Sequence, residues 1–504
     1  MYFTGKLRLF AALIASAAIA SGTLLSCLPQ QQAPLRPHAS LQPSDEDRCP
    51  LWKPDLPALD VVGIPKDVCD GGPPWEDFAH MAWQTFKTLV WPAAGRGKPD
   101  KGLPIDHPTG SRVFETYKAD WETFLDKAAQ PDEWHAYPEK APVCANVDTM
   151  KPPLDKDSLV LASLHKFGNL DQVFEPGPTP LFHILVSQNR SLVRYLTGFG
   201  EHSFNTIRNN KLYEPQTLKN SDDPPVPPRY FEPGSIEKKF VGSINIKSAW
   251  IEMEGFSRDE KQSFYTRMAW VQDPPYDAAP RNCRLALVGL VALHIAHKTK
   301  SSPQWIWASF EHRRNVPDSE QGPDGGRYTF NDGRGTTPMA DAPPPEAQLP
   351  YFRVNPFAIP DPFNVERKKA IPQVLRDINH SWQGKLTNTV WKNYELVAVQ
   401  WPKYGRSPGR TGADEDKPGG KATAYPQPPC LGFDRNSSIA NSVIETFLQA
   451  NTDCKGNRET NPTCMSCHNL VRNYDFVWSV YVKDNDTAKA AISVLRQNLS
   501  VPQQ

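Results

Sequence analysis

Apolar residues recur at helical spacing in one early stretch of the chain. Between Trp75 and Trp91, Phe78, Phe86 and Leu89 fall on one face of a helix. Pro92 follows, and a proline cannot continue a helix because it lacks a backbone donor and clashes with the preceding turn. The pattern therefore predicts an amphipathic helix from Trp75 to Trp91.

Beyond this helix, the apolar pattern changes to the alternation or the short continuous runs that are typical of β-strands. The segments with this pattern are Phe240–Met253, Ser263–Gln272, Leu285–His297, Trp305–Phe310 and Glu395–Trp401. The two continuous runs, Leu285–His297 and Trp305–Phe310, suit a buried sheet. We therefore expect residues 49–425 to form a large α+β domain with a mostly antiparallel sheet.

The chain starts with a pattern of its own. Lys6 and Arg8 precede an apolar run from Leu9 to Leu25 that is broken only by small residues. A basic start followed by a short apolar stretch is typical of a secretory signal peptide and is too short for a stable membrane span. We expect residues 1–26 to direct export to the periplasm or cell surface of a bacterium.

Two cleavage sites compete within this signal. Ala18-Ile19-Ala20 is an ordinary small-residue site, whereas Leu24-Leu25-Ser26-Cys27 resembles a bacterial lipobox. In lipoproteins with that motif, the cysteine becomes the lipid-modified first residue. The resemblance favours Cys27 as a membrane anchor, and the polar, proline-rich residues 27–48 as a flexible tether.

Composition adds two points. The chain has 51 prolines, about twice the usual share, which indicates a loop-rich architecture. Its 56 basic residues equal its 56 acidic residues, so no global field favours binding to nucleic acid. The carboxylate pairs Glu252 with Glu254 and Asp259 with Glu260 are expected to be solvated rather than catalytic.

The cysteines divide into groups. Of the nine, Cys27 belongs to the lipobox, and Cys464 and Cys467 belong to a separate motif. Six remain, an even number that suits disulfides in an oxidising compartment. The plausible bridges are Cys49–Cys69, Cys144–Cys283 and Cys430–Cys454, although six cysteines allow fifteen pairings.

The separate motif is Cys464-Met465-Ser466-Cys467-His468. C-x-x-C-H is the attachment signature of c-type haem. The two thiols form thioethers with the porphyrin, and the adjacent histidine becomes the proximal ligand of the iron. We therefore expect one covalently bound haem c, held by Cys464 and Cys467 and ligated by His468.

Two other interpretations of this motif are weaker. A redox or structural C-x-x-C does not need the histidine that follows. A zinc site with Cys430, Cys454, Cys464 and Cys467 has only one short cysteine knuckle, where a zinc ribbon has two.

We expect residues 426–504 to form a small helical, cytochrome c-like haem segment. Ser442-Val443-Ile444-Glu445 is a capping box that predicts the start of one helix, and Thr487–Leu499 has the spacing of another. Apolar cover for the haem is expected from Leu470, Tyr474, Phe476, Val477 and Val480.

The sixth ligand of the iron is left open. No methionine or histidine follows His468, so the ligand comes from upstream or the position is vacant. The candidates are His294, His297, His312, Met253, Met268 and Met339. Two strong ligands indicate an electron carrier, whereas an open position binds small molecules. The three histidines are also weak candidates for a separate metal site. Trp305 and Trp307 are weak candidates for residues that relay electrons to the haem.

The block from His294 to Pro317 contains HIAHKT, PQWIWASFEH and N-x-P, and the C-terminal region contains CMSCH. With these motifs, the chain resembles a family of exported bacterial cytochrome c proteins that have a long N-terminal region and one haem. The resemblance implies the thioether roles of Cys464 and Cys467 and the ligand role of His468, and nothing more.

These observations predict a monohaem cytochrome c that transfers electrons to or from a redox partner protein. One alternative is a haem-dependent oxidase, peroxidase or oxygenase whose large domain forms a substrate pocket. Another is a haem-based redox or gas sensor. No catalytic motif in the large domain distinguishes them.

Overall fold

The structure is a computed structural model of the 504-residue chain. It describes residues 62–68, 74–141, 143–151, 154–161, 193–214, 231–235, 240–272, 282–299, 305–318, 328–330, 367, 370–401, 441–444, 451–452, 458–459, 468 and 474–481. All of these belong to one compact unit, Ser44–Gln504. The predicted signal, tether, Cys27 and final helix lie outside the described residues.

The predicted first helix is confirmed as α2, Pro74–Leu89. Glu76 and Asp77 lie in its first turn and Lys87 in its last, which matches the direction of the helix dipole. Its apolar face, which includes Phe78 and Phe86, is buried in the main core.

The centre of the fold is an eight-stranded sheet among the described residues. Its strands are β3 (Lys118–Ala119), β4 (Val160–Leu161), β5 (Val193–Phe199), β6 (Ile244–Glu252), β7 (Thr266–Gln272), β8 (Cys283–His297), β9 (Ile306–His312) and β10 (Tyr394–Gln400). The main order is β10-β9-β8-β6-β5-β3, with β7 paired to β8 and β4 to β7. Only the β4–β7 pairing is parallel in this sheet. The five predicted strand segments are therefore confirmed as β6, β7, β8, β9 and β10.

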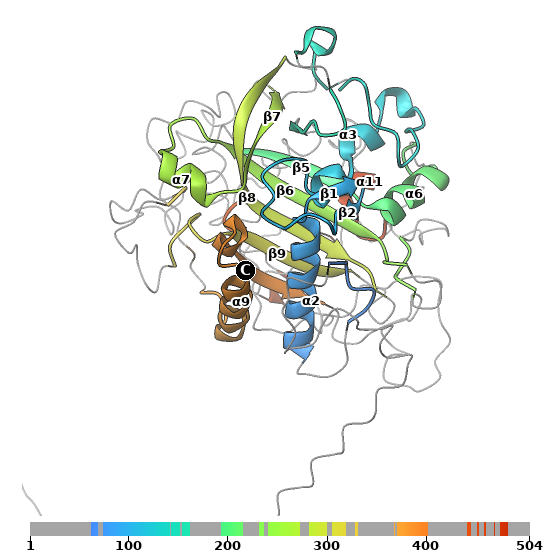
Figure 1. The fold of residues 1–504 in the computed structure, drawn as a ribbon. Coiled ribbons are helices and arrows are strands. Elements are labelled where there is room, and N and C mark those ends of the chain that lie inside the picture. The colour runs from blue at the N-terminus through green and yellow to red at the C-terminus, as the bar shows by residue number, and fades with distance from the viewer. Residues whose placement is uncertain are drawn as a thin grey trace, which may run out of the picture. The chain divides into compact units, whose positions relative to one another are not determined.

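Two helices cover one face of the sheet, which we call the helix face. Figure 1 shows α2 and α9 (Gln373–Lys385) side by side over β9 and β10. The Phe86 ring stacks on Phe310 of β9 at 4.3 Å, and Trp83 stacks on Trp382 of α9 at 5.9 Å. The Trp83 indole also donates to Asn379 at 2.9 Å, so its polar atom is satisfied inside the core.

The opposite face, which we call the His294 face, carries the side chains that matter for the candidate site. Ala296 pairs with Trp307, and His294 lies between Lys247 of β6 and Ser309 of β9. Residues directly opposite each other in antiparallel strands point to the same side of a sheet. These five side chains therefore share one face.

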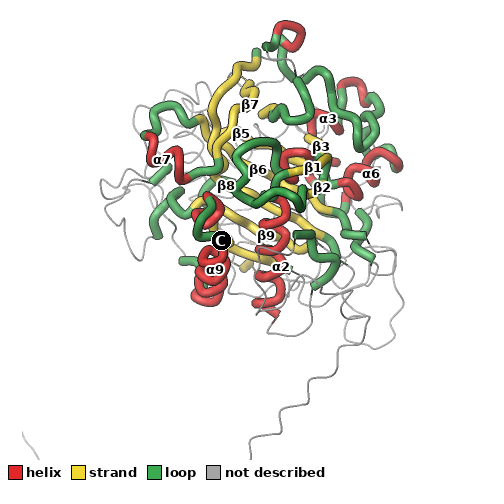
Figure 2. Tube along the Cα trace, viewed as in Figure 1, coloured by secondary structure: helices red, strands yellow, loops and turns green. Residues whose placement is uncertain are grey.

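The remaining elements are short and connect or flank the sheet (Figure 2). The helical ones are α3 (Asp120–Thr123), α6 (Glu201–Asn209), α7 (Arg258–Ser263), α11 (Trp478–Tyr481) and the 3-10 turns Val113–Thr116, Asp126–Ala128, Val147–Thr149 and Val390–Asn393. The strands are β1 (Ala93–Gly95), β2 (Lys98–Pro99), β11 (Asn451–Thr452) and β12 (Arg458–Glu459). α6, α7 and α9 were not predicted from the sequence. α6 and α7 are too short for helical periodicity to stand out from the surrounding loops, whereas α9 has buried Leu375, Ile378 and Trp382 at helical spacing and could have been found.

One predicted disulfide is confirmed. Cys144 and Cys283 are bonded, and they link the loop before β4 to the start of β8. The Asn146 side chain binds both the amide and the carbonyl of Cys283, at 2.8 and 3.0 Å. The other two predicted pairs lie outside the described residues.

One sequence expectation was wrong. Glu252 is not solvated: it is buried at the end of β6 and pairs with Arg194 at 3.1 Å and with Arg284. The helix predicted to start at Ser442 runs into residues outside the described ranges. In the described turn, Asn441 accepts the amides of Val443 and Ile444 at 2.9 and 3.0 Å, and the Ser442 hydroxyl donates to Glu311.

The α+β class with a mostly antiparallel sheet is confirmed. Between 426 and 504 the described structure consists of the turn at 441–444, β11, β12, His468 and the segment 474–481. Tyr474, Phe476, Val477 and Val480 are buried in the main core, and Leu470 lies outside the described residues. Their role as apolar cover for a haem stays a prediction. Within the described part of the chain, no helix has the length and apolarity to cross a membrane.

Candidate functional site

His468 is the residue of the C-x-x-C-H motif that the structure describes, and one of its ring nitrogens is held by the backbone. Its Nδ1 lies 2.6 Å from the carbonyl oxygen of Phe476. A carbonyl can only accept, so Nδ1 carries the proton and Nε2 carries the lone pair. Burial lowers the pKa of His468 to about 4, so the imidazole is neutral in ordinary buffer. This is the arrangement that a metal-ligating histidine needs.

The turn that supplies this carbonyl is strained. Asp475 and Phe476 have φ angles of 51° and 65°, in the left-handed region that non-glycine residues rarely adopt. Such a conformation persists where the surroundings hold it in place, and it often marks a ligand site.

Contacts from the large domain hold the turn. The Asp475 carboxylate accepts the Phe231 amide at 2.9 Å and binds the Lys298 ammonium, and both charged side chains are buried. The Asp475 carbonyl accepts the Trp305 indole N–H at 2.8 Å. Trp305 is therefore a buried anchor of this turn.

Trp307 brings His468 against the sheet. The two rings lie 4.4 Å apart, centroid to centroid, and are tilted by 51°. Trp307 projects from β9 on the His294 face, so His468 lies over that face. Sequence reasoning named Trp307 only as a weak relay candidate, and the structure places it in contact with the predicted iron ligand.

His294 lies next to this contact and belongs to a chain of hydrogen bonds. Its Nε2 is 3.0 Å from the Ser309 hydroxyl, which in turn accepts from the Asn441 amide at 3.0 Å. Burial lowers the pKa of His294 well below its usual value, and the positive charge of Lys247, which lies opposite it on β6, lowers it further.

The two other candidate histidines lie elsewhere. His297 pairs with Ile244 and Ile306, three residues from His294 and on the helix face, where burial lowers its pKa to about 3. Neither of its ring nitrogens has a hydrogen-bond partner among the described residues. His312 uses both nitrogens: Nε2 binds the Ser263 carbonyl at 2.9 Å, and Nδ1 accepts the Arg314 amide at 3.2 Å.

Two of the three methionine candidates are described, and both lie away from the strand positions around His294. Met253 is buried, and it lies six residues along the chain from Lys247, the residue opposite His294. Six residues of extended strand span about 20 Å. Met268 is on β7 and 46% exposed, and Met339 lies outside the described residues. No group of three metal-binding side chains occurs within the described ranges, so His294, His297 and His312 do not form a separate metal site.

The structure does not describe Cys464 and Cys467, so their thioether roles stay predictions. The same holds for Cys430 and Cys454 of the zinc interpretation. What the structure contributes is the environment of His468, and that environment fits a haem ligand.

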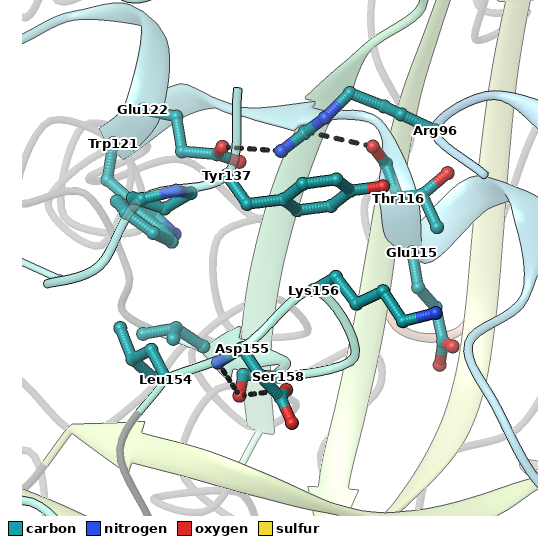
Figure 3. Close-up of a pocket in the computed structure, with 12 residues that line it drawn as sticks. Arg96, Glu115, Thr116, Trp121, Glu122, Tyr137, Leu154, Asp155, Lys156 and Ser158 are labelled. Atoms are coloured by element: carbon teal, nitrogen blue, oxygen red, sulfur yellow. Dashed lines mark hydrogen bonds and ion pairs between the residues drawn. The ribbon is translucent and has the colours of Figure 1, made fainter. Parts of the chain in front are cut away.

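A separate small pocket lies beside β3 and the 3-10 turn Val113–Thr116 (Figure 3). Three of its charged side chains form ion pairs: Arg96 binds Glu122 at 3.1 Å, and Glu115 binds Arg267 at 2.6 Å. Arg96 also lies over the Tyr137 ring at 4.2 Å. The free space is about 30 Å³, close to that of one water. We assign this pocket a structural role.

Sequence reasoning missed most residues that build the site. They are Phe231, Lys298, Ser309, Asn441, Asp475 and the Phe476 carbonyl. Their roles arise from contacts between distant segments, which leave no local spacing to find. The one sequence signal for any of these residues was that Lys298 directly follows the His294-Ile295-Ala296-His297 motif.

No family model matches the chain, and neither a curated protein nor a solved structure matches it.

Proposed function

We propose that this protein is an exported monohaem cytochrome c that transfers electrons. Cys464 and Cys467 hold haem c, and His468 ligates its iron through Nε2. The observation that best supports this proposal is the hydrogen bond that His468 Nδ1 donates to the Phe476 carbonyl. This bond fixes the tautomer and leaves Nε2, the nitrogen that would ligate the iron, on the other side of the ring. When bound, haem c supplies a one-electron ferric–ferrous couple.

The chain's own residues hold and shield this site. The turn at 474–477 positions His468, and Trp307 packs against its ring. The haem segment is residues 426–504, and its small helical character is part of this proposal. The large domain docks a redox partner protein or covers the haem edge.

The proposed location is the periplasm or cell surface, with Cys27 as a lipid anchor. The Cys144–Cys283 disulfide supports export, because stable disulfides persist in oxidising compartments. Replacing Cys27 by serine should release the protein from the membrane fraction, and retention there would reject the anchor.

Haem attachment is tested by expression with a cytochrome c maturation system and haem staining after denaturing electrophoresis. The wild-type chain should retain haem, and Cys464→Ala with Cys467→Ala should lose it. Cys144→Ala with Cys283→Ala is the matched control, because it removes two cysteines outside the motif and should keep haem. A wild-type chain without covalent haem would reject the proposed function and favour the disulfide or zinc interpretation.

A further inference from the structure

We propose that Trp307 is a positioning residue for the haem, because its indole fixes the plane in which the His468 imidazole meets the iron. The inference deepens the proposed function and rests on it. Groups outside the coordination sphere orient a metal-ligating histidine. In a haem protein, that orientation is one of the means by which the chain sets the electronic state of the iron.

The hydrogen bond at Nδ1 restrains the His468 ring in only one direction. Nδ1 lies 2.6 Å from the Phe476 carbonyl oxygen, which fixes the position of that nitrogen. A carbonyl oxygen accepts over a broad range of angles, so the ring can still rotate about the line from Nδ1 to the oxygen. The described residues offer no hydrogen-bond partner to Nε2 that would stop this rotation. A second contact is needed to fix the plane of the ring.

The Trp307 indole supplies this second contact. Its ring centroid lies 4.4 Å from that of His468, and the two planes are tilted by 51°. This separation is at the close end of the range for aromatic pairs, so the two rings touch. Rotation of the imidazole toward the indole is therefore blocked.

Trp307 is itself held firmly by the sheet. On β9 it pairs with Ala296 of β8 and with Gln400 of β10, so its backbone has a neighbouring strand on both sides. Its indole packs against Ala398 of β10. A residue inside a paired sheet cannot shift without breaking ladder hydrogen bonds, and the indole therefore offers a fixed surface.

Trp305 links the two restraints on the imidazole. Its ring centroid is 6.2 Å from that of Trp307, two residues further along the chain. Trp305 is 2% exposed, and its indole N–H donates to the Asp475 carbonyl at 2.8 Å. Asp475 directly precedes Phe476, whose carbonyl accepts from the imidazole. The acceptor of Nδ1 and the ring beside the imidazole are therefore tied to the same stretch of chain.

The test reads the proton NMR spectrum of the ferric full chain with its haem attached. The four ring methyl groups of the porphyrin are widely spread when an axial imidazole keeps one plane, and the spread narrows when the plane varies. Cyanide is added if the ferric protein is not already low-spin, because cyanide is symmetric about its bond to iron and adds no orientation of its own.

Trp307→Leu should narrow the spread of the four methyl resonances, because it removes the flat surface beside His468. Trp307→Phe keeps a ring and should stay closer to the wild-type pattern. A wild-type pattern in Trp307→Leu would overturn the proposal, and so would an equal change in the two variants. Trp307→Ile is a second variant without a ring, and its β-branched side chain suits a strand if Trp307→Leu does not fold.

Trp391→Leu is the matched control for the loss of a tryptophan. Trp391 is fully buried and packs against Phe86 of α2. Its replacement should lower stability to urea and leave the methyl pattern as in wild type, whereas an equal change of pattern would show general loosening and overturn the proposal. Haem staining on denaturing gels reads the proposed function separately. A wild type without covalent haem rejects that function, and intact haem with an unchanged pattern in the variants without a ring rejects this inference alone.

Discussion

The Lys298 ammonium and the Asp475 carboxylate form a buried ion pair between residues 177 positions apart in the sequence. The pair joins the end of β8 to the strained turn that carries the Phe476 carbonyl. Burial pushes the pKa of Lys298 down and that of Asp475 up, and the attraction between the two charges opposes both shifts. Each of the two buried charges is therefore stabilised by the charge of its partner.

Asp475→Asn should destabilise the protein by about 3 to 5 kcal/mol, because it leaves the Lys298 charge buried without its partner. Urea unfolding measures the loss. Adding Lys298→Met removes the second charge and should recover part of the stability, since the cost is mostly that of an unpaired charge. Equal stability of Asp475→Asn and wild type would mean that the pair does not form.

The same substitution should also raise the midpoint potential of the attached haem. A carbonyl that accepts from Nδ1 makes the imidazole a stronger donor and stabilises ferric iron, so a looser turn weakens that effect. Potentiometric titration gives the shift, with Glu252→Gln as a control for a buried ion pair on the large domain. A potential that changes equally in both variants would indicate a general loss of stability.

Removing the Cys144–Cys283 disulfide should destabilise the protein by about 2 to 5 kcal/mol, because the bond closes a long loop and restricts the unfolded chain. Denaturant unfolding of Cys144→Ala with Cys283→Ala measures it. A reductant should produce a similar loss in the wild type and none in the variant. Peptide mapping without reduction that finds either cysteine in another bridge would contradict the assignment.

His297→Leu should flatten the dependence of stability on pH. The pKa of His297 falls from 6.5 to about 3 on folding, so the unfolded chain takes up a proton first as the pH drops. Stability therefore falls from about pH 6.5 downward, by about 1.4 kcal/mol per pH unit for each such histidine. His312 shows the same shift and remains in the variant.

Urea unfolding at pH 7.5 and at pH 4.5 tests this prediction. The variant should gain stability relative to wild type at the lower pH, and it also removes two buried nitrogens that lack partners among the described residues. Parallel curves for the two proteins would show that His297 does not stay neutral in the fold.

Glu311→Gln should loosen the turn at 441–444. The Glu311 carboxylate binds Arg367 through one oxygen, and through the other it accepts the Ser442 amide at 2.8 Å and hydroxyl at 2.7 Å. Hydrogen exchange should rise in peptides that contain Ser442–Ile444 and stay low in β8. Ser442→Ala removes only the hydroxyl bond and should have a smaller effect. Unchanged exchange in both variants would argue that other contacts hold the turn.

Several features of the fold could be predicted because their causes are local. The helix at α2 follows from apolar spacing and Pro92, and the strands β6 to β10 follow from alternation or short apolar runs. Glu252 shows the limit. A carboxylate in a charged stretch looks solvated, and the approach of Arg194 from β5 and Arg284 from β8 makes its burial tolerable.

The features of the candidate site also fall into those that local sequence determines and those that tertiary contacts determine. The sequence by itself determined the haem signature, the expected ligand His468 and a set of possible sixth ligands, since these depend on residue type and short spacing. Tertiary structure decided which of them meet: strand alternation turns His294 and His297 to opposite faces, and sheet register brings His294 beside Trp307. The anchors of the Phe476 carbonyl come from Phe231, Lys298 and Trp305, far away in the chain. Contacts between distant segments depend on how the whole sheet closes, and no local pattern of residues encodes that.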